Sequence, residues 1–217
     1  MTLSFEVTLS LEELLARGLA AQGVECGLAT QQRLIAFAHL LHKWSKVYNL
    51  TAIRDLQQIV IRHILDSISI LPYLKGPRIL DVGAGAGLPG IPLALLSPQY
   101  HFTEMDSVAK KTRFMQQAIA ELEMDNVSVA TRRVEQLPSD VTYNTVLTRA
   151  FASLADIIAK AGQLCAPEGV LLAMKGSYPE QELADIPPSF RVEAIHKLSV
   201  FGLDEQRYLV ALVPQAT

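Results

Sequence analysis

The sequence predicts an α/β protein in which a mostly parallel β-sheet follows an N-terminal helical segment. Residues 10–75 have the apolar spacing of amphipathic helices. From Arg78 onward, short strand-like runs alternate with helix-like runs, which is typical of a parallel sheet with crossover helices. A glycine-rich loop, 81–90, joins the first such strand to the next helix. We therefore expect residues 1–76 to form a helical cap packed on the same domain as a core of residues 77–217.

Composition limits the class of protein. Of the 217 residues, 50% are hydrophobic and 19% are charged, so a packed core is expected. The net charge of −3 argues against coating nucleic acid through bulk charge, although a local basic patch stays open. Two distant cysteines, Cys26 and Cys165, suggest neither a disulfide framework nor a metal site, and they fit a reducing compartment.

The N-terminus lacks a basic region followed by an apolar run, so we expect no signal peptide. No apolar run reaches the roughly 18 residues that a membrane span requires. The sequence thus predicts a cytoplasmic protein that does not associate with membranes.

Three helices are expected before the sheet. Ser10–Glu13 forms a capping box, and the helix that follows should end near Gly23. Thr30 can cap a second helix, which should end around Asn49. Asp55 can cap the third, and Pro72 ends it.

The expected strands of the parallel sheet are 78–82, 101–105, 127–130, 145–148 and 170–174. Helices are expected at 90–96, 108–123 and 153–164, and a weak one at 179–184. Two final strand-like runs, 191–200 and 207–213, are joined by a short turn. They predict a hairpin-like antiparallel addition to the sheet.

The glycine loop matches two patterns. Gly85-x-Gly87-x-x-Gly90 is a dinucleotide-binding pattern, in which the helix N-terminus binds a pyrophosphate. Asp81-x-Gly83-x-Gly85-x-Gly87 is the loop that S-adenosylmethionine methyltransferases carry after their first strand. A third interpretation, a purely structural tight turn, is weakened by Asp106, which lies at the end of the second strand.

Asp106 is placed to bind ribose hydroxyl groups in either ligand interpretation, or to cap the helix after it. Other features favour the methyl donor over a dinucleotide. Pro89 and Pro92 remove two backbone N–H groups from the turn, which weakens phosphate binding. Helices precede the first strand, and two strands follow the fifth, as in a seven-stranded methyltransferase sheet.

Several segments, in order and spacing, resemble the RsmG (GidB) family of bacterial 16S ribosomal RNA methyltransferases. These segments are 44–51, 62–67, 81–92, 106–111 and 149–154. The resemblance implies a class I, Rossmann-like methyltransferase fold with a mostly parallel seven-stranded sheet. It also implies methyl transfer from S-adenosylmethionine to N7 of one guanine in 16S ribosomal RNA.

The resemblance assigns contacts with the methyl donor to Gly83, Leu88, Val134, Glu135 and Arg149. The loop pattern adds Gly85, Gly87 and Asp106. Arg149 is expected to position the reactants, either by pairing with the carboxylate of the methyl donor or by contacting RNA. Both roles stay open, as does a surface cation at a strand end.

Guanine N7 has a lone pair and no proton, so no general base is expected at that atom. The residues after the fourth strand, 148–151, read Thr-Arg-Ala-Phe and lack the Pro-Pro-aromatic stretch typical of exocyclic amine methylation. Methylation of a pyrimidine carbon needs a thiol nucleophile. Cys165 is expected to be a buried apolar residue instead.

RNA contacts are expected from cations and one imidazole: Arg62, His63, Lys110, Lys111, Arg132, Arg133 and Lys175. Solvated helix faces explain these residues equally well. His63 and Asp66 are three residues apart and could pair with each other. The expected partner is 16S ribosomal RNA or the assembling small subunit, bound by a monomer without a metal.

Two alternatives stay open on the residues alone. A dinucleotide-dependent oxidoreductase would use the same loop for NAD(P). A non-catalytic protein could keep the fold and bind S-adenosylmethionine as a structural ligand.

Overall fold

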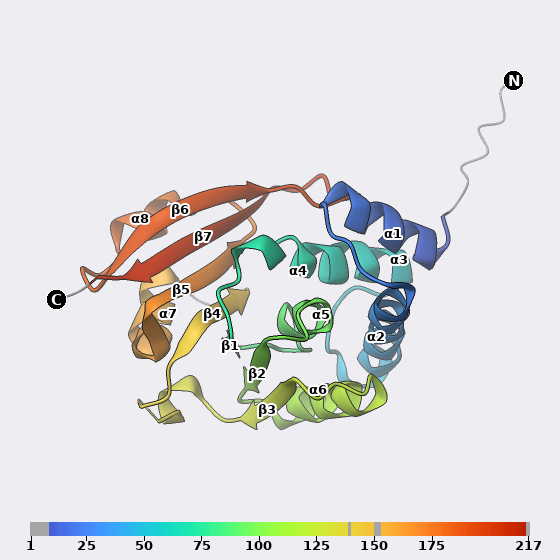
Figure 1. Ribbon diagram of the computed structural model, residues 1–217, viewed down its shortest axis with the longest axis horizontal. Helices are drawn as coiled ribbons and strands as arrows, with labels where there is room; N and C mark the ends of the chain where they lie inside the picture. Colours follow the sequence, from blue (N-terminus) through green and yellow to red (C-terminus); the bar gives the residue numbers. More distant parts are fainter. Residues whose placement is uncertain (1–8, 139, 150–152, 216–217) are drawn as a thin grey trace, which may run out of the picture.

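The structure is a computed structural model that describes residues 9–138, 140–149 and 153–215. Within these ranges, seven strands form one sheet in the order β3-β2-β1-β4-β5-β7-β6 (Figure 1). The strands are β1 Arg78–Val82, β2 His101–Asp106, β3 Val127–Thr131, β4 Tyr143–Arg149, β5 Cys165–Lys175, β6 Phe190–Leu198 and β7 Arg207–Pro214. Strands β1 to β5 pair in parallel, which confirms the mostly parallel seven-stranded sheet.

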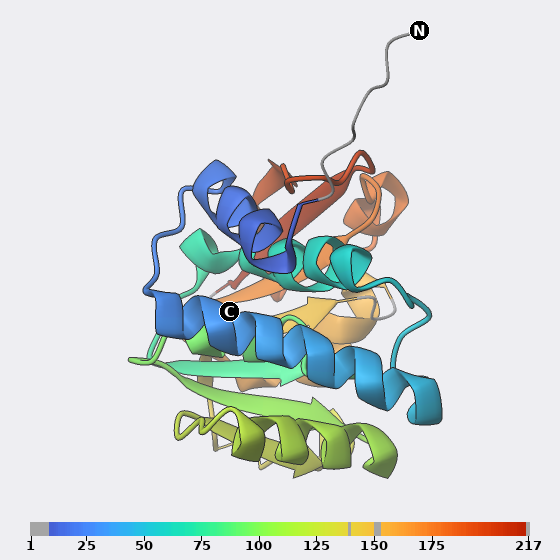
Figure 2. The same ribbon diagram turned by 90° about the vertical axis from the view of Figure 1, so that its right-hand side faces the viewer.

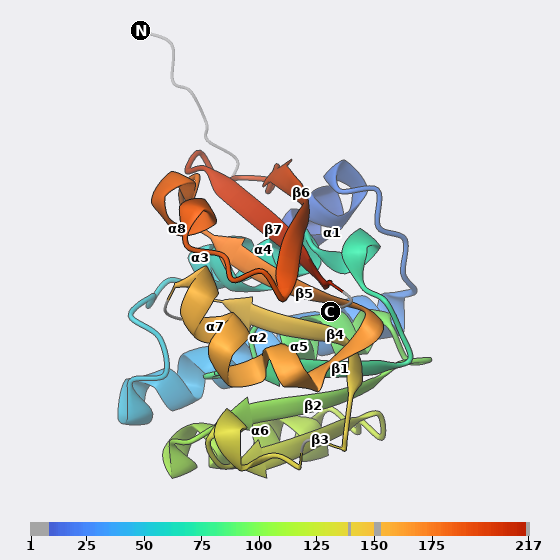
Figure 3. The same ribbon diagram turned by 90° about the vertical axis from the view of Figure 1, so that its left-hand side faces the viewer.

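Helices cover both faces of this sheet. The α-helices are α1 Leu11–Ala21, α2 Leu28–Tyr48, α3 Leu56–Ile59, α4 Asp66–Ile68, α5 Gly90–Leu96, α6 Ala109–Glu121, α7 Leu154–Ala161 and α8 Glu180–Ala184. The N-terminal helices lie with α5 and α6 on one face (Figure 2), and α7 lies on the other (Figure 3). Among the described residues, no helix is both long and apolar enough to cross a bilayer.

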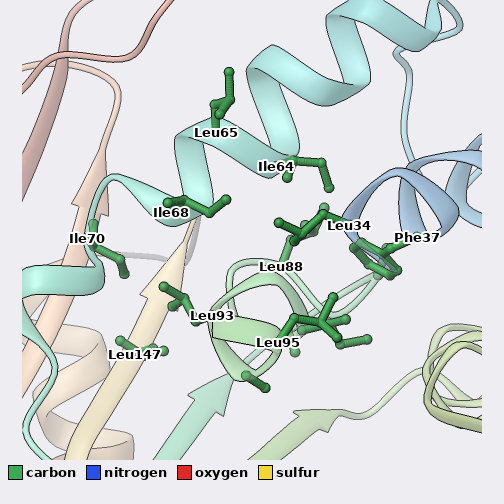
Figure 4. Close-up of a cluster of buried hydrophobic side chains, with 14 of the residues drawn as sticks. Leu34, Phe37, Ile64, Leu65, Ile68, Ile70, Leu88, Leu93, Leu95 and Leu147 are labelled. Carbon is green, nitrogen blue, oxygen red and sulfur yellow. The ribbon is translucent and has the colours of Figure 1, made fainter. Parts of the chain in front are cut away.

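Successive strand residues point to opposite faces, so each strand contributes to two cores. On β1, Ile79 belongs to the core beneath the N-terminal helices and Leu80 to the core beneath α7. Leu147 and Val146 of β4 divide in the same way. The larger core extends from the sheet to α1 and α2, so the N-terminal helices bury their apolar faces on the same sheet (Figure 4).

Side-chain caps explain where α1 and α3 begin. The Ser10 hydroxyl accepts a hydrogen bond from the Glu13 N–H at 3.1 Å, and the Glu13 carboxylate accepts from the Ser10 N–H at 3.0 Å. Asp55 accepts from the Gln58 N–H at 2.8 Å. The start expected at Thr30 was wrong, because α2 begins after Gly27 without a side-chain cap.

The third predicted helix is not one continuous α-helix. Residues Val60–Leu65 form a π-helix, η1, between α3 and α4. The π-helical turn places Arg62 and His63 beside a cavity, and Asp66 follows at the start of α4. Such insertions occur frequently at functional sites. After α4, the chain forms a 3₁₀ turn, η2 Leu71–Tyr73, that contains Pro72.

The C-terminal pair of strands is antiparallel, as expected. Strand β7 lies between β5 and β6 and pairs antiparallel with both. Because β7 runs against β5, it begins at the edge of the sheet where β5 ends, and Lys175 pairs with Tyr208 there. The first residue of β7, Arg207, therefore lies at the carboxyl edge of the parallel strands.

Two carboxyl groups meet inside the sheet. Asp81 of β1 pairs in register with Glu104 of β2, and both side chains are buried. Asp81 accepts a hydrogen bond from the Gly90 N–H at 2.9 Å, and its carboxyl group lies beside that of Glu104. Two adjacent buried carboxyl groups cannot both be charged without a large cost, so the pKa of each is raised. Burial raises the pKa of Asp81 to about 7, and burial with the charge of Asp81 raises that of Glu104 well above its usual value.

Replacing Glu104 by Gln should change how stability depends on pH. Both folded-state pKa values are raised, so the natural protein loses stability as pH rises from about 4 through the folded values. A Gln amide is uncharged and does not titrate, so the repulsion between the two carboxyl groups is removed. We expect Glu104→Gln to gain roughly 1–3 kcal/mol over the natural protein between pH 5 and 8, since one pKa unit corresponds to about 1.4 kcal/mol.

Urea unfolding at several pH values measures this difference. The matched control is Glu168→Gln, because Glu168 is exposed on β5 of the same sheet. The control should keep the natural pH dependence. If Glu104→Gln keeps it too, the buried pair does not cause that dependence.

Candidate functional site

A cavity of about 430 Å³ lies at the carboxyl ends of β1 and β2, which is where open α/β sheets bind ligands. We call it the β1–β2 cavity. It is lined by Val82, Gly83, Met105, Asp106, Ser107, Val108, Lys111, Arg132, Arg133, Val134, Glu135 and Lys160. Four of the residues predicted to bind the methyl donor are therefore found together here.

The glycine loop presents its backbone to this cavity. Gly83, Gly85 and Gly87 all have positive φ, which other residues rarely adopt. Gly83 is exposed, and a Cβ on Gly85 would meet only open space, with the nearest atom 3.9 Å away. Gly87 differs, because a Cβ there would collide with Ile91. Gly83 and Gly85 thus leave room for a ligand, whereas Gly87 allows close packing with the following helix.

Asp106 fixes the shape of the loop from the end of β2. Its Oδ2 atom accepts hydrogen bonds from the Gly85 N–H at 3.1 Å and from Lys111 Nζ at 3.2 Å. Its Oδ1 atom accepts from the Val108 N–H at 2.8 Å, immediately before α6. Asp106 therefore holds the backbone just before α6 but does not cap it, because α6 starts after Val108 without a side-chain cap, and it also lines the cavity.

The other predicted residues differ in what they can offer. Leu88 is buried in the larger core, in the cluster that includes Leu34 and Ile64 (Figure 4), so its side chain is not available to a ligand. Val134 and Glu135 lie on a short 3₁₀ helix, η3 Val134–Gln136, after β3. Val134 is buried and Glu135 is exposed at the cavity.

Arg149 does not line the β1–β2 cavity but a second one, of about 400 Å³. This second cavity lies between the N-terminal helical segment and the ends of β4, β5 and β7. We call it the arginine pocket. It is lined by Ile53, Arg62, His63, Asp66, Arg149, Met174, Lys175, Gly176 and Arg207. Ala150, Phe151 and Ala152, part of the segment that follows Arg149, lie outside the described residues.

Asp66 contacts two arginines from distant parts of the chain. Its Oδ1 atom accepts from Arg207 Nε at 3.0 Å, and its Oδ2 atom accepts from Arg149 Nη1 at 3.4 Å. Burial raises the pKa of Asp66, and the two guanidinium groups oppose that shift. Burial also lowers the pKa of Arg149, which the negative charge of Asp66 opposes.

The helical spacing suggested that His63 pairs with Asp66, but the structure shows other partners for His63. Its Nε2 atom lies 2.7 Å from the Thr51 hydroxyl, and its Nδ1 atom lies 3.1 Å from the Arg62 carbonyl oxygen. The carbonyl can only accept, so Nδ1 carries the proton and the Thr51 hydroxyl donates to Nε2. Burial, with the charge of Arg149, lowers the pKa of His63 to about 4. The imidazole is therefore neutral at neutral pH.

The predicted RNA-contacting residues divide between the two cavities. Arg62, His63 and Lys175 line the arginine pocket. Lys111, Arg132 and Arg133 line the β1–β2 cavity. Lys110 is exposed on α6 and lines neither.

Sequence reasoning did not identify Arg207 as part of the site. It opens the last strand, and its partner Asp66 is 141 positions away in the chain. In the sequence, the one indication of such a contact was Asp66, an acidic residue that lies off the apolar face of its predicted helix.

A family model described as rRNA small subunit methyltransferase G matches residues 30–210. A relative named ribosomal RNA small subunit methyltransferase G, from Nitrosococcus oceani, is 48% identical over 204 residues, covering 94% of this chain and 95% of its own. The protein of the same name from Escherichia fergusonii is 47% identical over 184 residues, covering 85% and 89%.

Solved structures resemble this one in fold. An S-adenosylmethionine-dependent methyltransferase from Aquifex aeolicus superposes with a TM-score of 0.57 at 16% identity, covering 78% of this chain and 98% of its own. A glycopeptide N-methyltransferase solved with S-adenosylmethionine gives 0.59 at 12% identity, covering 69% and 94%. The fold is therefore that of class I methyltransferases, as the sequence predicted.

Removing the Asp106 carboxylate should destabilise the loop. Asp106→Ala leaves the Gly85 and Val108 N–H groups without their partner, which costs about 1–3 kcal/mol when such groups are buried. Asp106→Asn keeps one acceptor oxygen and should lose less. Urea unfolding should therefore rank the natural protein above Asn and Asn above Ala. Equal stability of the three proteins would contradict a role of Asp106 in fixing the loop.

Proposed function

Because the chain belongs to the rRNA small subunit methyltransferase G family, we propose that it methylates N7 of one guanine in 16S ribosomal RNA. The methyl donor is S-adenosylmethionine. The substrate is the RNA, free or in the assembling small subunit, which places the activity in the cytoplasm. The observation that carries this proposal is the glycine loop facing the β1–β2 cavity beside a fixed carboxylate, Asp106.

The residues of the cavity fit the methyl donor. The open backbone at Gly83 and Gly85 admits its amino-acid part without a side chain in the way. Asp106 can accept hydrogen bonds from ribose hydroxyls if Lys111 moves from its Oδ2 atom. Val134 and Glu135 line the same cavity, where they can contact the adenine. When bound, S-adenosylmethionine supplies an electrophilic methyl group on a sulfonium.

The chemistry requires alignment rather than proton transfer. N7 of guanine is an acceptor with no proton to remove, so a general base is not needed there. The protein has to align two reactants and exclude water. The neutral His63 imidazole and the fixed arginines of the adjoining pocket are compatible with such a site. Burial raises the pKa of Cys165 to about 12, so this thiol is unsuited to attack a pyrimidine carbon.

A methyl-transfer assay tests the proposed function. Purified protein is incubated with labelled S-adenosylmethionine and unmodified 16S RNA, either free or in small subunits, and the nucleosides are separated by mass spectrometry. We expect label in 7-methylguanosine at a single position. Label in another nucleoside would refute the N7 assignment, and no label in either substrate would refute the enzyme. Calorimetric binding of NAD but not S-adenosylmethionine would favour an oxidoreductase instead.

Gly83→Val should abolish binding of the methyl donor while the protein stays folded. The residue has a φ of +73° and is exposed at the cavity, so a branched side chain there would be strained and would occupy the ligand space. Calorimetry with S-adenosylmethionine measures the loss, and circular dichroism checks the fold.

Gly23→Val is the matched control for this change. Gly23 has a φ of +68° and open space around it, so it carries the same backbone strain after α1, where it lines neither of these cavities. The control should bind S-adenosylmethionine normally. Normal binding by Gly83→Val would show that the loop does not contact the methyl donor.

A further inference from the structure

One exposed surface beside the β1–β2 cavity has no part in the site described above. Helices α2 and α6 pack against each other on the same face of the sheet (Figure 2). Arg33, near the start of α2, donates to the Leu122 carbonyl just after the end of α6. The Trp44 ring, near the end of α2, has its centroid 5.7 Å from that of Phe114 in the first half of α6. The two helices are therefore antiparallel, and the end of α2 lies beside the start of α6.

The start of α6 lies at the carboxyl edge of the parallel strands, because only residues 107 and 108 separate it from the end of β2. Lys111 in the first turn of α6 lines the β1–β2 cavity, whereas its neighbour Lys110 is exposed and lines neither that cavity nor the arginine pocket. The end of α2 and the start of α6 therefore form a surface next to the β1–β2 cavity but outside it. We call it the α2–α6 surface, and it consists of Val47, Tyr48, Lys110 and Arg113.

A row of aromatic rings connects this surface to the protein interior. Phe37 and Phe114 are fully buried, with ring centroids 6.1 Å apart. Trp44 contacts Phe114 and stacks on Tyr48, with the latter two centroids 5.2 Å apart and 28° between the ring planes. The Tyr48 residue is 41% exposed, and its neighbour Val47 is 73% exposed. The Tyr48 ring thus rests on a packed core on one side and stays accessible to a partner.

The last turn of α2 is held in place by the loop that follows it. Arg54 donates to the Ser45 carbonyl at 2.7 Å and to the side-chain oxygen of Asn49 at 2.9 Å. The Asn49 N–H also donates to the Ser45 carbonyl, at 3.1 Å. The exposed ring of Tyr48 therefore stands on a fixed helix end, which lowers the cost of ordering it when a partner binds.

The surroundings of Tyr48 carry positive charge and no carboxylate of their own. Residues 26–54 and 107–120 contain no Asp or Glu, although the whole chain has 22 of them. The packing of α2 on α6 brings these two segments together. Among the described residues, no ion pair involves Lys110 or Arg113. The charge of the α2–α6 surface is thus complementary to an anionic partner.

Lys110 also opposes the dipole of α6. The N-terminal end of a helix carries a partial positive charge, so a cation in the first turn is unfavourable unless an anion lies nearby. Lys111 has such an anion, because Asp106 accepts a hydrogen bond from its Nζ atom at 3.2 Å. In the described part of the chain, Lys110 has none. A bound anion at this surface would remove the repulsion between Lys110 and the helix dipole.

We propose that the α2–α6 surface binds ribosomal RNA outside the target nucleotide. An unpaired base stacks on Tyr48, and the neighbouring phosphates bind Lys110 and Arg113. One strand of RNA has both parts that this surface suits, because each nucleotide combines an aromatic face with a phosphate. Sequence-specific RNA recognition commonly uses unpaired bases that stack on aromatic side chains. This inference rests on the proposed function and adds a place where the RNA docks beside the cavity.

Tyr48→Ala tests the stacking contact. Filter binding with labelled, protein-free 16S RNA measures affinity without methyl transfer. We expect Tyr48→Ala to bind this RNA roughly five- to tenfold more weakly, because the stacked base loses its partner. Tyr48→Phe keeps the ring and should keep the natural affinity. The matched control is Leu28→Ala, which removes a 77% exposed apolar side chain from the opposite end of the same helix and should bind normally.

Lys110→Gln tests the phosphate contact through the salt dependence of binding. A lysine that neutralises a phosphate releases a counterion, so its loss should lower the slope of log affinity against log salt concentration by roughly 0.7–0.9. Tyr48→Ala should keep the natural slope, because stacking releases no counterion. The control is Arg191→Gln, which removes an exposed cation from β6 at the far edge of the sheet and should also keep it.

Two further measurements separate RNA docking from a structural role. Calorimetric affinity for S-adenosylmethionine and the melting temperature should stay close to the natural values in both variants, because both side chains are exposed and line neither cavity. Natural RNA affinity of Tyr48→Ala, or a natural salt slope of Lys110→Gln, would overturn the inference.

Other partners give different outcomes. Weaker binding of Tyr48→Ala to small subunits, with natural affinity for protein-free RNA, would identify a ribosomal protein as the partner and overturn the inference. A dimer in sedimentation velocity that Tyr48→Ala disrupts, again with natural RNA affinity, would assign the surface to a second copy of the chain. If the natural protein methylates no RNA but the affinity pattern holds, only the proposed function fails. If it methylates 16S RNA and both variants bind normally, only this inference fails.

Discussion

Two buried carboxylates determine the shape of the glycine loop, and the rest of the site depends on that shape. Asp81 accepts from the Gly90 N–H where the loop enters α5, and Asp106 accepts from the Gly85 N–H in its middle. Because a buried N–H group needs a partner, these two bonds select one path for a segment that glycine alone would leave free. The ligand cavity beside β2 exists because the loop follows this path.

The loop also separates two cavities that have different linings. On the β2 side, backbone and one carboxylate face a cavity suited to a small polar ligand. On the β4 side, arginines and apolar side chains face another. The first is built from the sheet and its connections, whereas the second also needs Ile53, His63 and Asp66 from the N-terminal helical segment. The N-terminal helical segment, which shares the larger core with the sheet, therefore also supplies polar residues to the second cavity.

Local signals in the sequence predicted most helices and strands. They could not predict contacts between residues that are far apart in the chain. The capping residues Ser10 and Asp55 act within four positions, and strand alternation repeats every two, so both can be read from a short window. The pairing of Asp66 with Arg149 and Arg207 spans 83 and 141 positions. The π-helix at Val60–Leu65 has no periodicity that separates it from an α-helix. Glu104 is polar yet fully buried beside Asp81 of the neighbouring strand, and burial with the charge of Asp81 raises its pKa.

The direction of β7 has a consequence for the order in which the protein is completed during synthesis. An antiparallel last strand begins where the parallel strands end, so Arg207 joins the pocket from the C-terminal end of the chain. A nascent chain that stops before residue 207 already contains the glycine loop and Asp106, yet it lacks the second partner of Asp66. Translation thus makes the residues of the β1–β2 cavity first and completes the arginine pocket only when residue 207 has been added.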